Sequence, residues 1–173
     1  MTIRAFAAAA PREVETREPA ALHGVLPWRQ ARKTGLRVLL VRPQDAALWS
    51  VPLGAPVEGR APFLSAALHA FEEAGVIGDI ETSPMIDYRR GGGSGGRIVL
   101  HAMNVRGTLS HWKMQDERLR QWFTLPEAAE RVADARLAEL IRALAVEPQA
   151  LTGARDAARA IPYAAAPQAV SAP

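Results

Sequence analysis

The feature that most constrains the fold is one amphipathic helix set between two groups of strand-like segments. The helix is predicted over residues 62–74, where apolar side chains recur at spacings of three and four and so share one side. The apolar positions of this stripe are Phe63, Ala67, Ala70, Phe71 and Ala74. Gly75 follows as the expected C-terminal stop. Because such a helix must bury its stripe, the neighbouring strands are expected to supply a sheet for it.

Strand-like and helical segments surround this helix in a simple order. Runs rich in β-branched and aromatic residues predict strands over 21–29, 36–43, 48–52, 80–90, 97–107 and 121–125. Residues 126–145 predict two closing helices, the second capped by Asp134. The glycine run GGGSGG is expected to be a hairpin loop, since no helix follows it to form a phosphate cradle. This order predicts an α/β fold with helices on both faces of a mixed sheet.

A length of 173 residues suits one domain with a real core. We expect the folded domain over residues 21–146, a flexible tail over 1–20 and a second tail over 147–173 that is partly helical near 150–160. The first residues faintly resemble a signal peptide, but their apolar stretch is short, so they are interpreted as part of the tail.

Composition limits the compartment and the partners. The chain contains no cysteine and no apolar run of the roughly 20 residues that cross a bilayer, so we expect a cytoplasmic protein that does not enter a membrane. The net charge is +3, and nearly all the basic residues are arginine, which suits binding of phosphate. A nucleic-acid partner is disfavoured because no long basic run or aromatic–basic repeat occurs. An oligomer is compatible with the sequence.

Two adjacent glutamates give the predicted helix its chemical interest. His69, Glu72 and Glu73 are spaced so that they share the helix face opposite the apolar stripe. Two like charges side by side need compensation, and either a divalent cation or arginines from neighbouring strands would supply it. By spacing alone, a solvated acidic patch on an amphipathic helix explains the pair better than a metal site.

The segment that begins at Trp49 resembles the Nudix box, Gly-x5-Glu-x7-Arg-Glu-U-x-Glu-Glu-x-Gly-U, where U is a bulky apolar residue. Gly54 falls on the first glycine, and Glu72 and Glu73 fall on the paired glutamates. The preceding Trp-x-x-Pro-x-Gly pattern, which includes Pro52, is similar to bacterial Nudix proteins of the diphosphoinositol and diadenosine polyphosphate hydrolase type.

The resemblance extends over roughly residues 22–145, including LPWR, LRVLLVR and the segment around QWFTLPEAAERV. It implies the Nudix fold, an α/β/α sandwich around a mixed β-sheet. The final apolar position of the box falls on Val76. The resemblance implies structural roles within the box for Trp49, Pro52, Gly54 and Gly75.

Several positions depart from the family pattern. The arginine and glutamate of the box fall on Leu68 and His69, and its earlier glutamate falls on Arg60. An acid usually found in the later loop falls on Met114. The chain therefore keeps two of the three carboxylates on the helix and loses the arginine that orients them. Imidazole is a poor ligand for Mg²⁺, so His69 would favour Mn²⁺ or Zn²⁺.

The resemblance implies a metal-dependent pyrophosphohydrolase with Mg²⁺ or Mn²⁺ as cofactor and a phosphate-containing small molecule as substrate. Glu72 and Glu73 would be the catalytic and metal-binding residues, assisted by His69. The proposed phosphate-binding residues are Arg42, Arg90, Arg118 and Arg120. Loss of a ligand together with its orienting arginine would weaken or alter this activity.

A catalytically inactive Nudix domain that binds a nucleotide or a protein partner is the open alternative. Acids outside the helix are weighed as replacements for the missing ligand, and these are Glu58, Asp116 and Glu117. His23, His101 and His111 show no ligand spacing and are assigned structural roles. The two hypotheses differ in whether the glutamate pair meets a third carboxylate or is neutralised by basic side chains.

Overall fold

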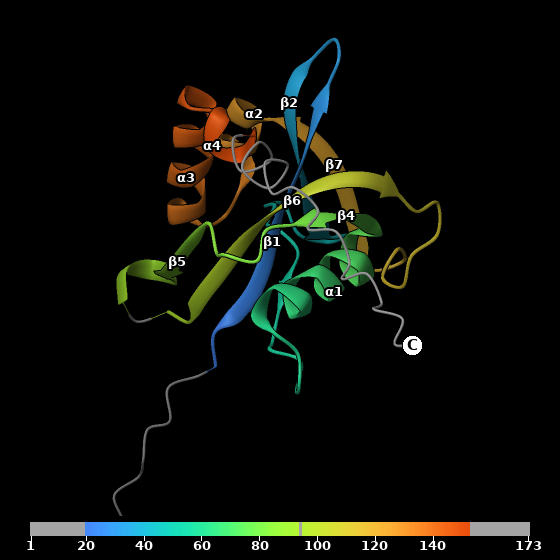
Figure 1. The fold of residues 1–173 in the computed structure, drawn as a ribbon, viewed down its shortest axis with the longest axis vertical. Coiled ribbons are helices and arrows are strands. Elements are labelled where there is room, and N and C mark those ends of the chain that lie inside the picture. The colour runs from blue at the N-terminus through green and yellow to red at the C-terminus, as the bar shows by residue number, and fades with distance from the viewer. Residues whose placement is uncertain (1–19, 94, 153–173) are drawn as a thin grey trace, which may run out of the picture.

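The computed structural model describes residues 20–93 and 95–152 of the chain (Figure 1). Of the tails predicted over residues 1–20 and 147–173, residues 1–19 and 153–173 lie outside these described residues. The elements, in chain order, are β1 (Leu22–Ala31), β2 (Gly35–Pro43), β3 (Leu53–Gly54), α1 (Pro62–Ala74), β4 (Val76–Ile80), β5 (Ile86–Arg89), a 3-10 turn (Arg90–Gly93), β6 (Arg97–Thr108), β7 (Arg118–Thr124), α2 (Leu125–Arg131), α3 (Ala135–Val146) and α4 (Gln149–Thr152).

Within the described part of the chain, seven strands form one mixed sheet. Its main path runs β4-β6-β1-β2-β7, while β3 pairs with β1 and β5 pairs with β6. The central pair, β1 and β6, is parallel, with Leu22 opposite Ile98 and Trp28 opposite Asn104. The other pairings between named strands are antiparallel. Figure 1 shows α1 on one face of this sheet and α2, α3 and α4 on the other.

The α1 face of the sheet is packed through small side chains. Ala66, Ala70 and Ala74 of α1 are fully buried and belong to one apolar cluster with side chains of β1, β2 and β6. Because alanine carries a single methyl group, it lets the helix backbone approach the strands closely. This close contact fixes which residues of α1 reach the sheet.

The opposite face carries the larger core. Trp28 and Phe123 are almost fully buried beneath the closing helices, and Leu137 and Ile141 of α3 pack against the same cluster. The helices begin at well-formed caps. Thr124 and Glu127 form a reciprocal capping box at α2, and the predicted Asp134 cap accepts from the amides of Arg136 and Leu137 at α3.

Two predicted strands are wrong in detail. The segment predicted as one strand over 80–90 is divided into β4 and β5, because Thr82 and Ser83 form a bend and the following Pro84 has no amide to continue a ladder. The segment 48–52 forms only isolated bridges at Trp49 and Ser50, and the strand there is β3.

The hairpin predicted around the glycine run is confirmed, because β5 and β6 pair as antiparallel strands. A short helix, α4, occupies Gln149–Thr152, and the rest of the segment 150–160, where a helix was expected, lies outside the described range. In the described residues, no helix combines the length and apolar character needed to cross a membrane.

Candidate functional site

The glutamate pair lies in the last turn of α1. The helix ends at Gly75, whose φ of 58° is left-handed and whose amide donates to the carbonyls of Ala70 and Phe71. An added Cβ at this glycine would come within 2.7 Å of the Trp112 side chain, so the position is crowded as well as left-handed. The end of the helix, and with it Glu72 and Glu73, is therefore held in a fixed place.

The apolar stripe predicted for α1 is partly wrong. Phe71 is 44% exposed, whereas Glu73 is only 8% exposed and shares the buried side with Ala66 and Ala70. The reason is that the alanines, and not the phenylalanines, pack on the sheet. Glu73 follows Ala70 by three residues and so shares its face. The two glutamates therefore have different environments: Glu73 is buried, and Glu72 is half-buried.

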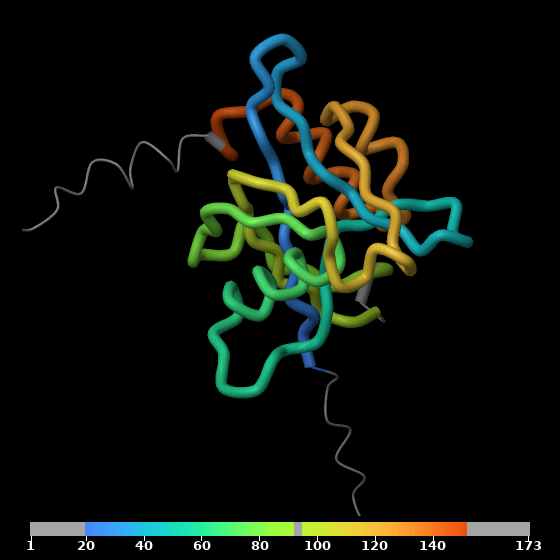
Figure 2. Tube along the Cα trace, turned by 90° about the vertical axis from the view of Figure 1, so that its right-hand side faces the viewer, coloured from blue at the N-terminus to red at the C-terminus, as the bar shows by residue number. Residues whose placement is uncertain are grey.

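Glu72 is paired with a lysine from the loop between β6 and β7. Nζ of Lys113 donates to Oε1 of Glu72 at 2.7 Å. The next residue, Met114, donates its backbone amide to the Glu72 carbonyl at 3.1 Å, so the loop is attached to the helix by main chain as well. Figure 2 shows this loop, in yellow to gold, passing beside the C-terminal end of α1.

Glu73 faces Arg118, the first residue of β7. Nε of Arg118 lies 3.5 Å from Oε2 of Glu73, which is close enough for an ion pair but at the far limit of hydrogen bonding. Burial raises the pKa of Glu73, and the positive charge of Arg118 and a backbone hydrogen bond from Leu53 oppose that increase. Burial is the largest of these effects, so the pKa of Glu73 lies above the ordinary glutamate value.

His69 is directed toward the loop that precedes α1. Its Nε2 lies 2.8 Å from the carbonyl oxygen of Ala55. Because a carbonyl only accepts, Nε2 carries the hydrogen and donates. Gly54 lies against the same ring, and a Cβ there would overlap the imidazole. The box glycine thus makes room for the histidine that stands at the family's metal-ligand position.

These residues do not complete a site for a divalent ion. Among residues 20–93 and 95–152, no three His, Cys, Asp or Glu side chains lie close enough together to hold a metal. The acids weighed as replacements, Glu58, Asp116 and Glu117, are exposed. Mg²⁺ needs several oxygen ligands, and Glu72 and Glu73 each face a basic side chain. The donor set therefore does not fit a Mg²⁺ or Mn²⁺ centre.

Two of the four predicted phosphate-binding arginines are engaged by backbone carbonyls. Nη1 of Arg120 donates to Ala74 O at 2.5 Å and its Nη2 donates to Leu109 O at 2.6 Å, while its guanidinium lies 3.8 Å from the Trp112 ring centroid. Arg42 likewise donates to the carbonyls of residues 43, 44 and 46. Both side chains fix loops at the ends of strands.

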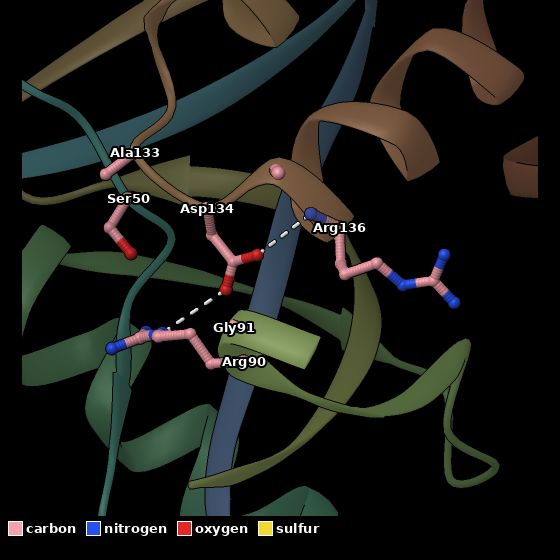
Figure 3. Close-up of a pocket in the computed structure, with 7 residues that line it drawn as sticks. Ser50, Arg90, Gly91, Ala133, Asp134 and Arg136 are labelled. Carbon is pink, nitrogen blue, oxygen red and sulfur yellow. Dashed lines mark hydrogen bonds and ion pairs between the residues drawn. The ribbon is translucent and has the colours of Figure 1, made fainter. Parts of the chain in front are cut away.

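Arg90 lies in a different place from the glutamate pair. It contributes to a cavity of about 580 Å³ at the start of α3, where its Nε lies 3.2 Å from Oδ2 of Asp134. Figure 3 shows Asp134 between Arg90 and the backbone of Arg136. Tyr88 also donates to Asp134, at 3.0 Å. Of the four arginines, Arg118 is the one whose side chain pairs with a glutamate of the predicted catalytic pair.

The other two residues expected to have structural roles, Trp49 and Pro52, are both buried. Trp49 is buried and meets Phe123 edge to face, with centroids 5.0 Å apart, and its backbone joins the chain around α2 through Arg131 and Ala133. Pro52 is buried, and its carbonyl accepts from the amide of β1 Val25.

Lys113 and the pair formed by Arg120 and Trp112 were missed from the sequence. Lys113 is one of only two lysines in the chain, but its loop has no pattern that would place it over α1. The sequence predicted Arg118 and Arg120 as phosphate-binding residues ahead of a strand expected over 121–125, whereas the structure begins β7 at Arg118 and includes both. The sequence could not show that one meets a carboxylate and the other meets carbonyl oxygens.

Comparison with known proteins supports the fold. No family matches this chain by its sequence, and no curated protein matches it. A solved structure of an Ap4A hydrolase from C. elegans, determined as a binary complex, is similar with a TM-score of 0.53 and 19% identity. The similarity covers 72% of this chain and 96% of that one. The predicted Nudix fold, a mixed sheet between helices, is confirmed.

Proposed function

We propose that this chain is a Nudix-fold domain that binds a phosphate-containing small molecule without efficient hydrolysis. The observation that carries the proposal is the pairing of the α1 carboxylates, Glu72 with Lys113 and Glu73 with Arg118. Basic side chains occupy the positions from which a divalent ion would be held. The similarity to an Ap4A hydrolase supports a phosphate-containing ligand, since that protein is named for a dinucleoside polyphosphate.

Electrostatics explain why the pairing opposes a metal. A divalent ion at Glu72 would have to displace the ammonium of Lys113 and lie near the guanidinium of Arg118. His69 does not compensate, because its Nε2–H is donated to Ala55 O. Removing one electrostatic stabiliser from such a site typically lowers the rate by about 10²–10³-fold. Here Leu68 and His69 stand at two such positions of the box, those of its arginine and glutamate.

The ligand is expected to lie on the β6–β7 loop side of α1. Lys113 is 66% exposed, so its ammonium can turn from Glu72 toward a phosphate oxygen. Arg118 lies beside it at the start of β7 with 29% of its side chain exposed. These two cations and the edge of Trp112 form the surface that we propose for the phosphate-containing molecule.

A second candidate is a weak metal-dependent pyrophosphohydrolase with Mg²⁺ or Mn²⁺ as cofactor. The observation in its favour is Glu73, a buried carboxyl whose pKa is raised by desolvation and which stands beside a second glutamate. Perturbed carboxyls of this kind are concentrated at catalytic sites, and a raised pKa suits a general base. In the described residues the metal-ligand set of this candidate is incomplete, and it therefore ranks second.

A combined binding and product assay tests the proposal. Dinucleoside polyphosphates, nucleoside diphosphate derivatives and inositol pyrophosphates are offered with Mg²⁺, Mn²⁺ or Zn²⁺. We expect one ligand class to raise the melting temperature, with no turnover by the wild type and a gain of turnover in the double variant Leu68→Arg, His69→Glu. Wild-type turnover that disappears in Glu73→Gln would establish the hydrolase instead. Absence of both binding and turnover would overturn both candidates.

A further inference from the structure

A second cavity lies at the opposite end of α1 from the glutamate pair. It has a volume of about 360 Å³, and Pro62, the first residue of α1, contributes to its wall. Two histidines of neighbouring strands, His23 of β1 and His101 of β6, also line it. In the parallel register His23 is opposite Val99, so both rings are on the same face of the sheet.

His101 presents an unused acceptor in this cavity. The residue is 1% exposed, and its Nδ1 lies 2.9 Å from the carbonyl oxygen of Glu81. Because that carbonyl only accepts, Nδ1 carries the hydrogen and the neutral ring keeps a lone pair at Nε2. Nε2 is buried and has no hydrogen-bond partner among the described residues. A buried polar atom without a partner is costly, which points to a missing ligand or water.

His23 repeats the pattern beside it. The residue is 8% exposed, and its Nδ1 is buried with no partner in the described residues. Burial lowers the pKa of His23, and the neighbouring His101, His69 and Arg97 lower it further. The His23 ring is therefore neutral near pH 7 and does not itself supply positive charge to a ligand.

Positive and hydrogen-donating groups lie beside these two rings. The start of α1 has no side-chain cap at Ala61 and no acidic residue in its first turn, so its dipole is uncompensated there. Its residue in the cavity wall, Pro62, has no amide hydrogen, so the helix contributes an electrostatic field and not a hydrogen bond. Arg97 lines the cavity and is held by Asp87, whose Oδ1 accepts from Arg97 Nε at 2.8 Å. The hydroxyl of Thr82 is also in the wall.

A ligand for this cavity must accept hydrogen bonds from one side and donate on the other. A phosphate group that retains a hydrogen does both, whereas sulfate and carboxylate ions at neutral pH only accept. A metal ion fits less well. Within the described part of the chain, the two histidines and Asp87 of the cavity wall do not come close enough together to hold one, and Asp87 is paired with Arg97.

We propose that this cavity binds a hydrogen-bearing phosphate group, which donates its O–H to Nε2 of His101, accepts from Arg97 and Thr82, and lies in the positive field at the start of α1. Inorganic phosphate keeps a hydrogen at pH 7.5, whereas a monoester has mostly lost its own above a pKa of about 6. Phosphate should therefore bind at pH 7.5, and a small monoester should bind only as the pH approaches 5.5. The site is separate from the surface at Lys113 and does not depend on the function proposed there.

Imidazole ¹⁵N NMR of the wild-type chain tests this site directly. Phosphate is titrated at pH 7.5 and constant ionic strength. Sulfate, methyl phosphate and Zn²⁺ are each titrated separately under the same conditions. The His101 Nε2 resonance should shift and saturate with phosphate, and sulfate should bind at least about tenfold more weakly, a difference of about 1.4 kcal/mol. Equal responses to sulfate and phosphate, or a response to Zn²⁺ alone, would overturn the proposal.

Variants separate this cavity from the glutamate face. His101→Leu should abolish phosphate binding measured by calorimetry, and Arg136→Ala, an exposed change outside both proposed surfaces, should leave that binding unchanged. Binding kept in His101→Leu but lost in Lys113→Met would place phosphate at the other end of α1 and refute the cavity site. If His101→Leu does not fold, the wild-type NMR titration still decides, because an unmoved His101 resonance contradicts the proposal.

Discussion

The Nε atom of Arg118 lies 3.5 Å from Oε2 of Glu73, at the junction of β7 and the last turn of α1. This relationship places a cation where the Nudix-like sequence predicts a metal. The pair is largely buried, since Glu73 and Arg118 keep only 11% and 29% of their side-chain surface exposed. Its counterpart, Glu72 with Lys113, is more exposed, so solvent screens its attraction more strongly.

The pH dependence of stability should report the burial of Glu73. Because burial raises the pKa of Glu73, the folded chain keeps a proton that the unfolded chain has already released. Stability from this group therefore falls as the pH rises from the ordinary glutamate pKa through the raised one. The variant Glu73→Gln cannot ionise at this position and avoids the fall in stability. It should therefore be more stable than the wild type near pH 7.5 and lose this advantage near pH 4.

Urea denaturation of the two proteins at several pH values measures this difference. Other carboxyls with shifted pKa values, such as Asp87, titrate in both proteins and cancel in the comparison. An unchanging gap between wild type and Glu73→Gln across the whole range would show that the carboxyl is not desolvated as described.

Arg120 should contribute strongly to stability rather than to ligand binding. It donates to the carbonyls of Ala74 and Leu109 and lies against Trp112, so it ties the end of α1 to the loop after β6. Arg120→Ala leaves these carbonyls without their charged donor, and we expect a loss of roughly 2–4 kcal/mol in unfolding free energy. Arg120→Lys should recover less than half of this stability, since an ammonium cannot donate to both carbonyls and stack on the Trp112 ring at the same time.

Arg136→Ala is the matched control for Arg120. Arg136 is exposed and pairs with Glu139 one turn away, so its removal should change stability by no more than about 0.5 kcal/mol. Similar losses for both arginines in chemical denaturation would contradict the structural role of Arg120.

Gly54 and His69 should behave as a coupled pair. A Cβ at position 54 would overlap the imidazole and disturb its hydrogen bond to Ala55 O, so Gly54→Ala should cost roughly 1–3 kcal/mol. With the ring removed in His69→Ala, the same glycine change should cost much less. A double-mutant cycle by thermal denaturation gives the coupling, and strictly additive changes would disprove the contact.

The sequence predicted the layers of the fold because its periodic patterns are local. The stop at Gly75, the Asp134 cap and the hairpin around residues 90–96 all depend on neighbouring residues and were confirmed. The division of the strand predicted over 80–90 was missed. The reason is that the effect of Pro84 was outweighed by the apolar residues around it.

The electrostatic environment of α1 could not be predicted in the same way. Whether Glu73 faces water or the sheet depends on the depth at which Ala66 and Ala70 pack, which is a tertiary property. The partners Lys113 and Arg118 come from positions about 40 residues away and reach the helix through a loop without periodic pattern. The two buried histidines were assigned structural roles because their sequence spacing hides that they share one cavity.

The central claim is that basic side chains, and not a divalent ion, neutralise the α1 glutamates. Titration of the wild type and Glu73→Gln with Mn²⁺, followed by paramagnetic broadening of backbone amide signals, tests it most directly. We predict no localised broadening around Glu72 and Glu73 at millimolar Mn²⁺, with the two proteins alike. Saturable broadening centred on these residues at micromolar Mn²⁺, and lost in Glu73→Gln, would contradict the account.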